Sequence, residues 1–278
     1  GFNIIERFSE DIDLAISHSF FSIEKTTKSQ REKLRKMSRT YIHETLSTQL
    51  DARLKEMGVS GYTIENVSQV QDKNGEWKPI DSDKDPTVIL IHYQSILEDT
   101  INYIPPRVKI EISCLSMDEP TELRQIRSLI GESFDGEDAD AESLVRTVVP
   151  TRTFLEKLFL LAEEFQKEKP RSVRMSRHLY DLEKLMDTKY GEEALSNRKL
   201  YDAIVEHRKA YYALKYVNYD LHSPSTISFT IPESVIGAWQ DDYADMRRFF
   251  IYGESLDFDA LMHRIRELQE RVRNICRK

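Results

Sequence analysis

The stretch "RFSEDIDLAI", residues 7–16, sets three carboxylates close together and then turns apolar. In an extended strand successive side chains point to opposite faces, so Leu14 and the two isoleucines would share one face. Asp11 and Asp13 would then share the other face, roughly 7 Å apart along the chain. Two carboxylates at that spacing suit Mg²⁺, which prefers oxygen ligands and completes its shell with water and substrate phosphates. The strand interpretation therefore predicts a metal-binding pair.

Two plainer interpretations of the same residues stay open. In the first, Ser9 caps a helix whose acidic first turn complements the helix dipole. In the second, the two aspartates line a solvated face of a strand and bind nothing. The strict apolar alternation favours the strand over the helix, but it does not separate a metal site from a solvated face.

A third carboxylate lies in "RVKIEISC", residues 107–114. As a strand, this stretch places its valine and isoleucines on one face, and Lys109 and Glu111 on the other. If it pairs beside the first strand, Glu111 would be aimed at the two aspartates, and three acids could hold two metal ions. The alternative is an exposed glutamate whose charge is paired with Lys109 or Arg107.

Composition and charge describe a folded protein. Hydrophobic residues make up 40% of the 278 residues, and the formal net charge of -8 gives no global attraction for polyanions. Cys114 and Cys276 lie far apart and outside any CxxC or histidine-rich stretch, so neither a disulfide framework nor a zinc site is predicted. No apolar run is long enough to cross a bilayer and no signal-like N-terminus is present, so we expect a cytoplasmic protein with no membrane insertion.

The first half of the chain has mixed α and β texture. A helical stretch spans 29–58, opened by Ser29 and closed by Gly58. The pair Asn74-Gly75 predicts a tight turn between extended segments. Besides the first strand, β-branched runs predict strands at 62–70, 87–95 and 108–115.

The second half is helical in texture. It follows an acidic loop at 135–142 that we expect to be solvated. We therefore predict an α+β fold with a mixed first domain, residues 1–145, and a helical second domain, residues 146–278. Helices are predicted to begin at Pro150 and to cover 175–188, 196–217, 232–252 and 257–277.

Four segments, in order, carry a resemblance to a known family: "RFSEDIDLAI", "VKIEIS", "TRTFLEKLFLLAEEF" and "SRHLYDLEKLM". Together they resemble the AbiEii/AbiGii nucleotidyltransferase toxins, the enzymatic half of bacterial abortive-infection and toxin–antitoxin pairs. The resemblance extends from residue 7 to about residue 190. It implies a small mixed sheet of the DNA polymerase β type, followed by a helical domain that completes a cleft.

The resemblance also implies roles for residues of the first domain. Asp11 and Asp13 match the metal-binding pair of the family, and Ser9 matches a serine of the same motif that serves nucleotide binding. Glu111 matches the third acid, less securely than the other two. These residues are the candidate metal ligands, with Ser9 as a candidate nucleotide contact.

Two residues of the second domain are implied as well. Lys157 matches a lysine that reaches the nucleotide triphosphate, and Asp181 matches a functional aspartate, so both are candidate catalytic residues beside Asp11 and Asp13. Without the resemblance, Lys157 would be taken for a solvated helical lysine. Asp181 would be taken for half of a surface pair with Arg177, four positions earlier on a helix.

The function implied is a transfer that depends on Mg²⁺ or Mn²⁺, from a nucleoside triphosphate to an acceptor hydroxyl on a tRNA end or a protein. The acceptor attacks the α-phosphate and pyrophosphate leaves, so negative charge must be neutralised on both the attacking and the leaving oxygen. A separately encoded antitoxin is the implied partner. The basic stretch 167–178 is a candidate RNA contact, although most charge runs are simply solvated faces.

Family members carry a Gly-Gly-Thr/Ser element a few residues before Arg-Phe-Ser, where backbone N–H groups hold nucleotide phosphates. The sequence begins at Gly1-Phe2-Asn3, without that element. We therefore expect an N-terminally incomplete first domain, whose catalysis depends on the missing element. The alternative function is a non-catalytic member of the fold that binds a nucleotide or a partner.

Overall fold

The computed structural model describes residues 2–9, 11–23, 27–72, 74–82, 84–96, 105–115, 120–134 and 142–277. The chain forms two compact units. The helical unit comprises Gly1–Phe8 and Glu119–Lys278, and the sheet unit comprises Ser9–Asp118. These limits differ from the predicted domain boundary at residue 145. The acidic loop predicted at 135–142 lies, except for its last residue, outside the described residues. Both helices and strands are present, so the predicted α+β class is confirmed.

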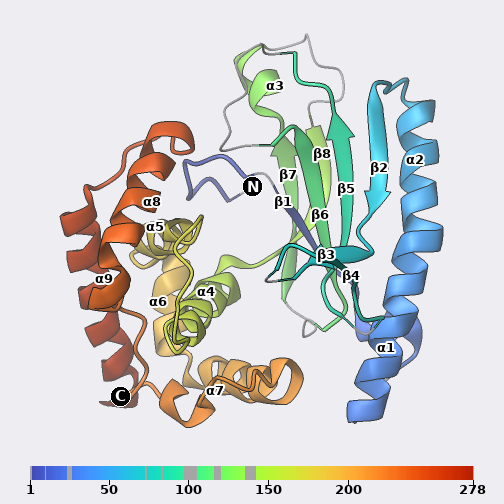
Figure 1. Cartoon of the computed structure of the whole chain (residues 1–278). Coiled ribbons are helices and arrows are strands. Elements are labelled where there is room, and N and C mark those ends of the chain that lie inside the picture. The colour runs from blue at the N-terminus through green and yellow to red at the C-terminus, as the bar shows by residue number, and fades with distance from the viewer. Residues whose placement is uncertain are drawn as a thin grey trace. The chain divides into compact units, whose positions relative to one another are not determined.

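The sheet unit is built on four strands in the order β1-β6-β5-β2 (Figure 1). Strand β1 runs parallel to β6, whereas the β5–β6 and β2–β5 pairs are antiparallel. The acidic segment after Ser9 is therefore a strand, and the interpretation of Ser9 as a helix cap is wrong. The strands are β1 (Asp11–Ala15), β2 (Tyr62–Asn66), β5 (Thr87–Tyr93) and β6 (Arg107–Ser113).

One long helical run covers a face of this sheet. It consists of α1 (Lys28–Thr40), a π-helical segment (Tyr41–Leu46) and α2 (Ser47–Glu56). The run begins within a residue of the predicted start, but its cap is Thr27 and not Ser29. The Thr27 side chain accepts a hydrogen bond from the backbone of Gln30, whose side chain accepts one from the backbone of Thr27.

The core of the sheet unit lies between this run and the isoleucines of β5 and β6. Edge strand β1 is less covered, since Ile12 and Leu14 remain 46% and 43% exposed. The core consists of buried Ile42, Ile89, Ile110 and Ile112, with Ile16, Tyr41, Leu46, Leu50, Ile64, Ile91 and Val108 packed against it.

The strand predicted at 62–70 is divided into β2 and a second short strand, β3 (Gln69–Gln71), which forms a small hairpin with β4 (Trp77–Pro79). Strand β3 pairs antiparallel with β4. Gly75 has a φ of +82°, a conformation that favours glycine, and its N–H donates to the carbonyl of Asp72. The turn predicted from Asn74-Gly75 is confirmed.

The helical unit contains a β-hairpin that the sequence does not predict. Strand β7 (Thr121–Arg127) pairs with β8 (Glu142–Val148) in antiparallel register. Its residues are mostly polar or exposed, so the apolar alternation that marks the other strands is absent. The helices are α3 (Leu129–Ser133), α4 (Pro150–Glu164), α5 (Ser176–Leu185), α6 (Lys189–Ser196), α7 (Arg198–His207), α8 (Ile236–Phe249) and α9 (Phe258–Arg273).

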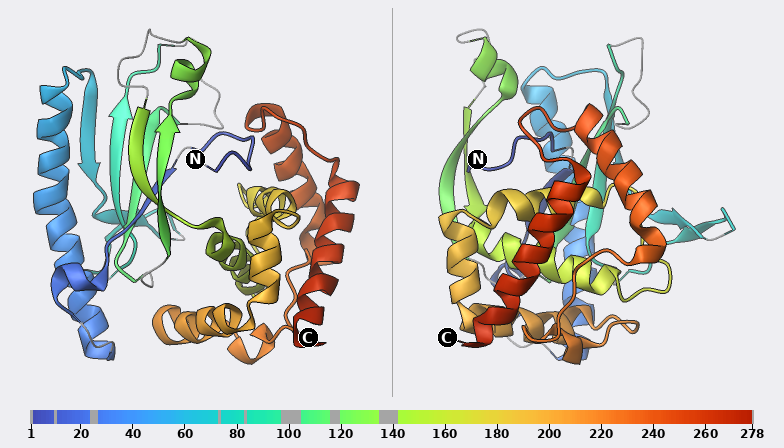
Figure 2. Two further views of the ribbon diagram at one scale, coloured as in Figure 1. Left: turned by 180° about the vertical axis from the view of Figure 1, so that it is seen from behind. Right: turned by 90° about the vertical axis from the view of Figure 1, so that its left-hand side faces the viewer.

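Helix α4 is central to the helical unit. Most of its apolar side chains, including Phe154, Leu158 and Phe159, are fully buried. It packs against α5, α6 and α7, and α5 packs in turn against α8 and α9, which lie side by side (Figure 2). In the described part of the chain, no helix combines the length and the apolarity that crossing a membrane requires.

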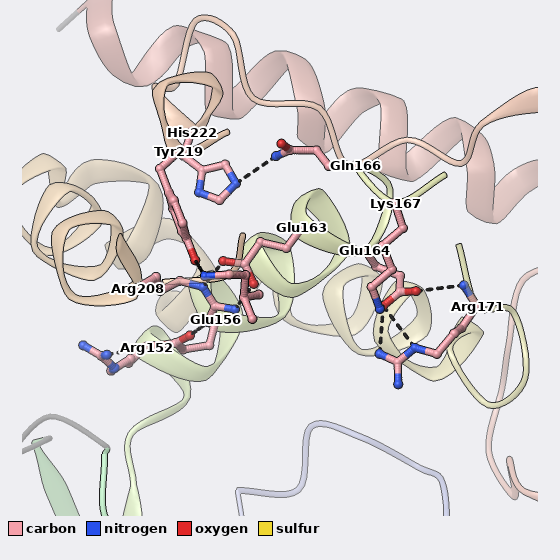
Figure 3. Close-up of polar contacts among 11 residues, drawn as sticks. Arg152, Glu156, Glu163, Glu164, Gln166, Lys167, Arg171, Arg208, Tyr219 and His222 are labelled. Carbon is pink, nitrogen blue, oxygen red and sulfur yellow. Dashed lines mark hydrogen bonds and ion pairs between the residues drawn. The ribbon is translucent and has the colours of Figure 1, made fainter. Parts of the chain in front are cut away.

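A buried network of charges runs along α4 (Figure 3). The guanidinium of Arg208 donates to the two carboxylate oxygens of Glu163 at 2.7 and 2.5 Å, and it also donates to Glu156. Arg152 donates to the other oxygen of Glu156 at 2.8 Å. Burial alone would lower the pKa of Arg208, but the hydrogen bond to Glu163 and the charges of both glutamates raise it. This network fastens to α4 the π-helical segment, Arg208–Tyr212, that follows α7.

The network predicts a large cost for removing one of its charges. The change Glu163→Gln would leave the buried guanidinium of Arg208 with one carboxylate partner in place of two. We expect the free energy of unfolding, measured by urea denaturation near neutral pH, to fall by about 3 kcal/mol.

The matched control is Asp202→Asn, which breaks the exposed ion pair with Arg198, whose side chain is 46% exposed while that of Asp202 is 52% exposed. This change should alter the free energy of unfolding by less than about 0.5 kcal/mol. Equal losses in the two variants would contradict the importance given to the buried network.

Candidate functional site

The carboxylates of the motif at residues 7–16 lie on the strand pair β1–β6. The parallel register places Asp11 beside Lys109 and Asp13 beside Glu111. Residues in register on neighbouring strands point to the same face, so these four charged side chains share one face of the sheet. The expected pairing of the two strands is confirmed, and it brings Glu111 next to the aspartates.

A cation lies among these carboxylates. Lys109 Nζ is 2.7 Å from Glu111 Oε1 and 3.9 Å from Asp11 Oδ2. The lysine side chain is 31% exposed, and that of Asp11 is 18% exposed. Its ammonium group therefore offsets the repulsion between carboxylates that the sequence places so close together. The pairing of Glu111 with Lys109, which the sequence left open as the alternative, is the arrangement present.

The donor set has the chemistry that Mg²⁺ requires. Mg²⁺ is commonly held by one or two carboxylates together with substrate phosphates and water, and Asp11 and Asp13 supply two on one face of a strand. Among the described residues, no three His, Cys, Asp or Glu side chains are grouped as a metal site. The aspartate pair thus fits Mg²⁺, whereas Glu111 is engaged by Lys109.

Ser9 lies two positions before this strand and is exposed. Its hydroxyl donates to the backbone carbonyl of Asp11 at 3.4 Å, a long hydrogen bond within the same turn of chain. The side chain is therefore close to the aspartate backbone and open to solvent.

The other candidate residues lie in the helical unit and contact each other. Lys157 Nζ, on α4, is 2.9 Å from Asp181 Oδ2, on α5. Arg7 donates from Nε to Oδ1 at 2.8 Å and from Nη2 to Oδ2 at 2.7 Å. The Asp181 side chain is 0% exposed, and those of Lys157 and Arg7 are 19% and 12% exposed. One buried carboxylate thus holds two cations.

Electrostatics fix the protonation states around this carboxylate. Burial alone would raise the pKa of Asp181, but the charges and hydrogen bonds of Lys157 and Arg7 outweigh it and lower the pKa to about 2. Burial, with the charges of Lys157 and Arg177, lowers the pKa of His178 to about 3. At neutral pH Asp181 is therefore charged and His178 is neutral.

The plainer interpretations of these two residues are wrong. Asp181 does not lie on the surface, and Lys157 is not a solvated lysine, because the two form a mostly buried ion pair. Sequence reasoning assigns no role to Arg7, although Arg7 opens the motif. No signal along the sequence links Arg7 to Asp181, because the pair joins positions 174 residues apart.

The basic stretch 167–178 is only partly available at the surface. Lys167 Nζ and Arg171 Nη2 contact the buried carboxylate of Glu164 at 2.7 and 2.8 Å, as Figure 3 shows. Burial alone would raise the pKa of Glu164, but the hydrogen bonds of Arg171 and Lys167 lower it. Arg171 nevertheless keeps 65% of its side chain exposed, and Lys169 is exposed. The stretch therefore folds back on α4 and still presents cations to solvent.

Comparison with known proteins gives the family of the chain. Residues 1–264 match the family model described as "Nucleotidyl transferase AbiEii toxin, Type IV TA system". No curated protein matches the chain. The family match covers nearly all of both units, and includes the carboxylate strand, the lysine of α4 and the aspartate of α5. The chain therefore belongs to the AbiEii nucleotidyltransferase toxins of type IV toxin–antitoxin systems.

Proposed function

We propose that this protein transfers a nucleotide from a nucleoside triphosphate to an acceptor hydroxyl on RNA, with Mg²⁺ bound by Asp11 and Asp13. The observation that carries the proposal is the parallel β1–β6 pair, which sets both aspartates on one face of the sheet. Membership of a nucleotidyltransferase family supports the class of reaction.

In the proposed reaction the acceptor oxygen forms a bond to the α-phosphorus, and the bond from that phosphorus to the bridging oxygen of pyrophosphate breaks. The acceptor hydroxyl gives its proton to solvent water, and pyrophosphate leaves with the electron pair of the broken bond. When bound, Mg²⁺ supplies positive charge that orients the triphosphate and stabilises the leaving group.

The residues of each unit serve this reaction in different ways. Asp11 and Asp13 provide the oxygen ligands, and Lys109 neutralises Glu111 beside them. In the helical unit, Lys157 provides a fixed positive charge for the triphosphate oxygens, an interaction of the charge-assisted kind. Asp181 holds the ammonium of Lys157 at 2.9 Å and so limits its rotamers.

RNA is the acceptor class that the charge distribution favours. Lys169 and Arg171 are exposed in the stretch that follows α4, and cations of this kind contact phosphate backbones. The remaining positive charges of the stretch are partly buried. A tRNA end offers a free hydroxyl as the acceptor, and it also offers a phosphate backbone that these cations can contact. The antitoxin implied by the family is a separate partner.

Transfer of label is the direct test of this function. The full-length protein is mixed with Mg²⁺, total tRNA and each of the four nucleoside triphosphates labelled at the α-phosphate. We expect label to appear in tRNA with at least one nucleotide, and Asp11→Asn to reduce the rate at least about 100-fold, since one of the two carboxylate ligands of Mg²⁺ is lost.

The control for this assay is Asp220→Asn, which changes an aspartate whose side chain is 87% exposed. It should leave the rate unchanged. Failure of the protein to label RNA with any nucleotide would contradict the proposal and favour a non-catalytic binding member of the fold. Transfer that persists in Asp11→Asn would contradict the role of the aspartate pair.

Lys109 provides a second test that does not depend on turnover. Because its ammonium lies near Asp11 and Glu111, we expect Lys109→Gln to raise the affinity for Mn²⁺ about 3- to 10-fold, the effect of removing one nearby like charge. Titration calorimetry with Mn²⁺ alone measures the affinity. Lys78→Gln, in an exposed pair with Asp72, is the control. Unchanged or weaker Mn²⁺ binding in Lys109→Gln would contradict the assignment of the metal site.

A further inference from the structure

The first residues of the chain are fastened to the helical unit through their backbone. Residues 1–8 belong to that unit although the helices begin far along the sequence. Arg7 forms an antiparallel bridge with Ile251, and the Phe8 N–H donates to the carbonyl of Phe250 at 2.9 Å. The N–H of Tyr252 donates to the carbonyl of Glu6 at 3.0 Å. Residues 6–8 therefore pair with residues 250–252 through an isolated antiparallel bridge.

Side chains also pack together where residues 6–8 meet residues 250–253, a contact region that we call the junction. The ring of Phe8 lies 6.4 Å from that of Phe250 and 5.3 Å from that of Tyr252, between ring centroids. Gly253 approaches the segment so closely that an added Cβ would lie 2.5 Å from the Cβ of Glu6. Any larger residue at position 253 would have to displace the segment.

Asp181 is the polar anchor of this junction. Both of its oxygens accept from Arg7, one of them also from Lys157, and the carboxylate is fully buried. Three of the roughly four acceptor positions of this carboxylate are therefore occupied by cationic groups, which disfavours a metal ion there. Its pKa of about 2 also makes it a weak base at neutral pH. Its contacts are those of a residue that holds other residues in place.

The junction divides the sequence motif between the two units. Arg7 and Phe8 belong to the helical unit, whereas Ser9, Asp11 and Asp13 belong to the sheet unit. The chain passes from the anchored arginine to the first aspartate within four positions. So short a link restricts where β1 begins with respect to the anchored residue.

We propose that the ion pair between Arg7 and Asp181 is a positioning device: it fixes the point from which the metal-binding strand begins, so both residues act on catalysis without touching substrate. This inference rests on the proposed nucleotidyl transfer. It assigns Arg7 as a positioning residue, and it changes Asp181 from a candidate catalytic residue to a positioning residue. Lys157 remains the group that meets the triphosphate.

Four variants and a control test the proposal, and one of the four is Asp181→Asn, which removes the charge of the anchoring carboxylate. Arg7→Ala removes the anchor, and Arg7→Lys keeps the charge but loses the two-pronged contact. Gly253→Ala displaces the segment without altering any charge. The control is Arg198→Ala, which breaks an exposed pair with Asp202. Each protein is measured by hydrogen exchange of residues 4–8 and 250–253, and by the kcat and KM of label transfer.

We expect Arg7→Ala to speed exchange of these amides about 10-fold or more, because a buried charge-assisted contact is lost. Its kcat should fall about 100-fold, with the KM for the nucleoside triphosphate changed less than about 2-fold, because the reacting groups are misplaced while Lys157 is retained. Gly253→Ala should show the same pattern, Arg7→Lys an intermediate one, and Arg198→Ala none. Asp181→Asn should lower kcat and also raise KM, since it releases Lys157.

Three results would overturn the proposal. The first is faster exchange in Arg7→Ala with an unchanged kcat. The second is normal transfer by Arg7→Ala and Gly253→Ala alongside an inactive Asp181→Asn, which would mean that Asp181 itself meets the substrate. The third is a wild-type protein that transfers nothing; this removes the proposed function and the positioning role together, and the exchange rates then show whether the anchor exists.

Discussion

The parallel pairing of β1 with β6 is the constraint on which the rest of the account depends. Side chains alternate along a strand, so a shift of one residue would send Asp11 and Asp13 to the opposite face. The buried Ile110 and Ile112 fix which face of β6 meets the helical run, so Lys109 and Glu111 lie on the other face. The register of β1 on β6 then places Asp11 and Asp13 beside them, so the position of the carboxylates follows from this strand pairing.

In each unit, the clustered charges described above are paired with opposite charges of the same unit. In the sheet unit, Lys109 lies among acids that would otherwise repel one another. In the helical unit, Asp181 is surrounded by cations, and the pair Glu163 and Arg208 is buried along α4. Buried charges of this kind are costly unless paired, so each cluster restricts the side chains that form it. The same restriction holds the ammonium of Lys157 against Asp181.

Local pattern in the sequence was enough for the elements that position the site. The alternation in residues 11–16 and 107–114 predicted both strands, and the spacing of apolar residues after Pro150 predicted α4. The β7–β8 hairpin escaped prediction because its strands are polar and exposed, so no apolar alternation marks them. Ser29 was a plausible cap, but Thr27 has a glutamine three positions later that completes a capping box.

Contacts between positions far apart in the chain could not be predicted from a single sequence. The burial of Asp181 and its pairing with Arg7 depend on the contacts of residues 6–8 with residues 250–252, which no local pattern encodes. The sequence predicted Glu111 either as a metal ligand or as the partner of a nearby cation. The two could not be separated, since Lys109 and Glu111 share one face of the strand whichever alternative holds. Motif residues can thus be identified from sequence, whereas the role of each depends on partners that only the fold supplies.

The central claim is that Asp11 and Asp13 hold a divalent ion, and anomalous diffraction from crystals soaked in Mn²⁺ with a non-hydrolysable nucleoside triphosphate tests it most directly. The account predicts an anomalous peak within bonding distance of both carboxylates, with Lys109 Nζ turned away from Asp11. A peak elsewhere, or electron density showing the two aspartates without metal at saturating Mn²⁺, would contradict it.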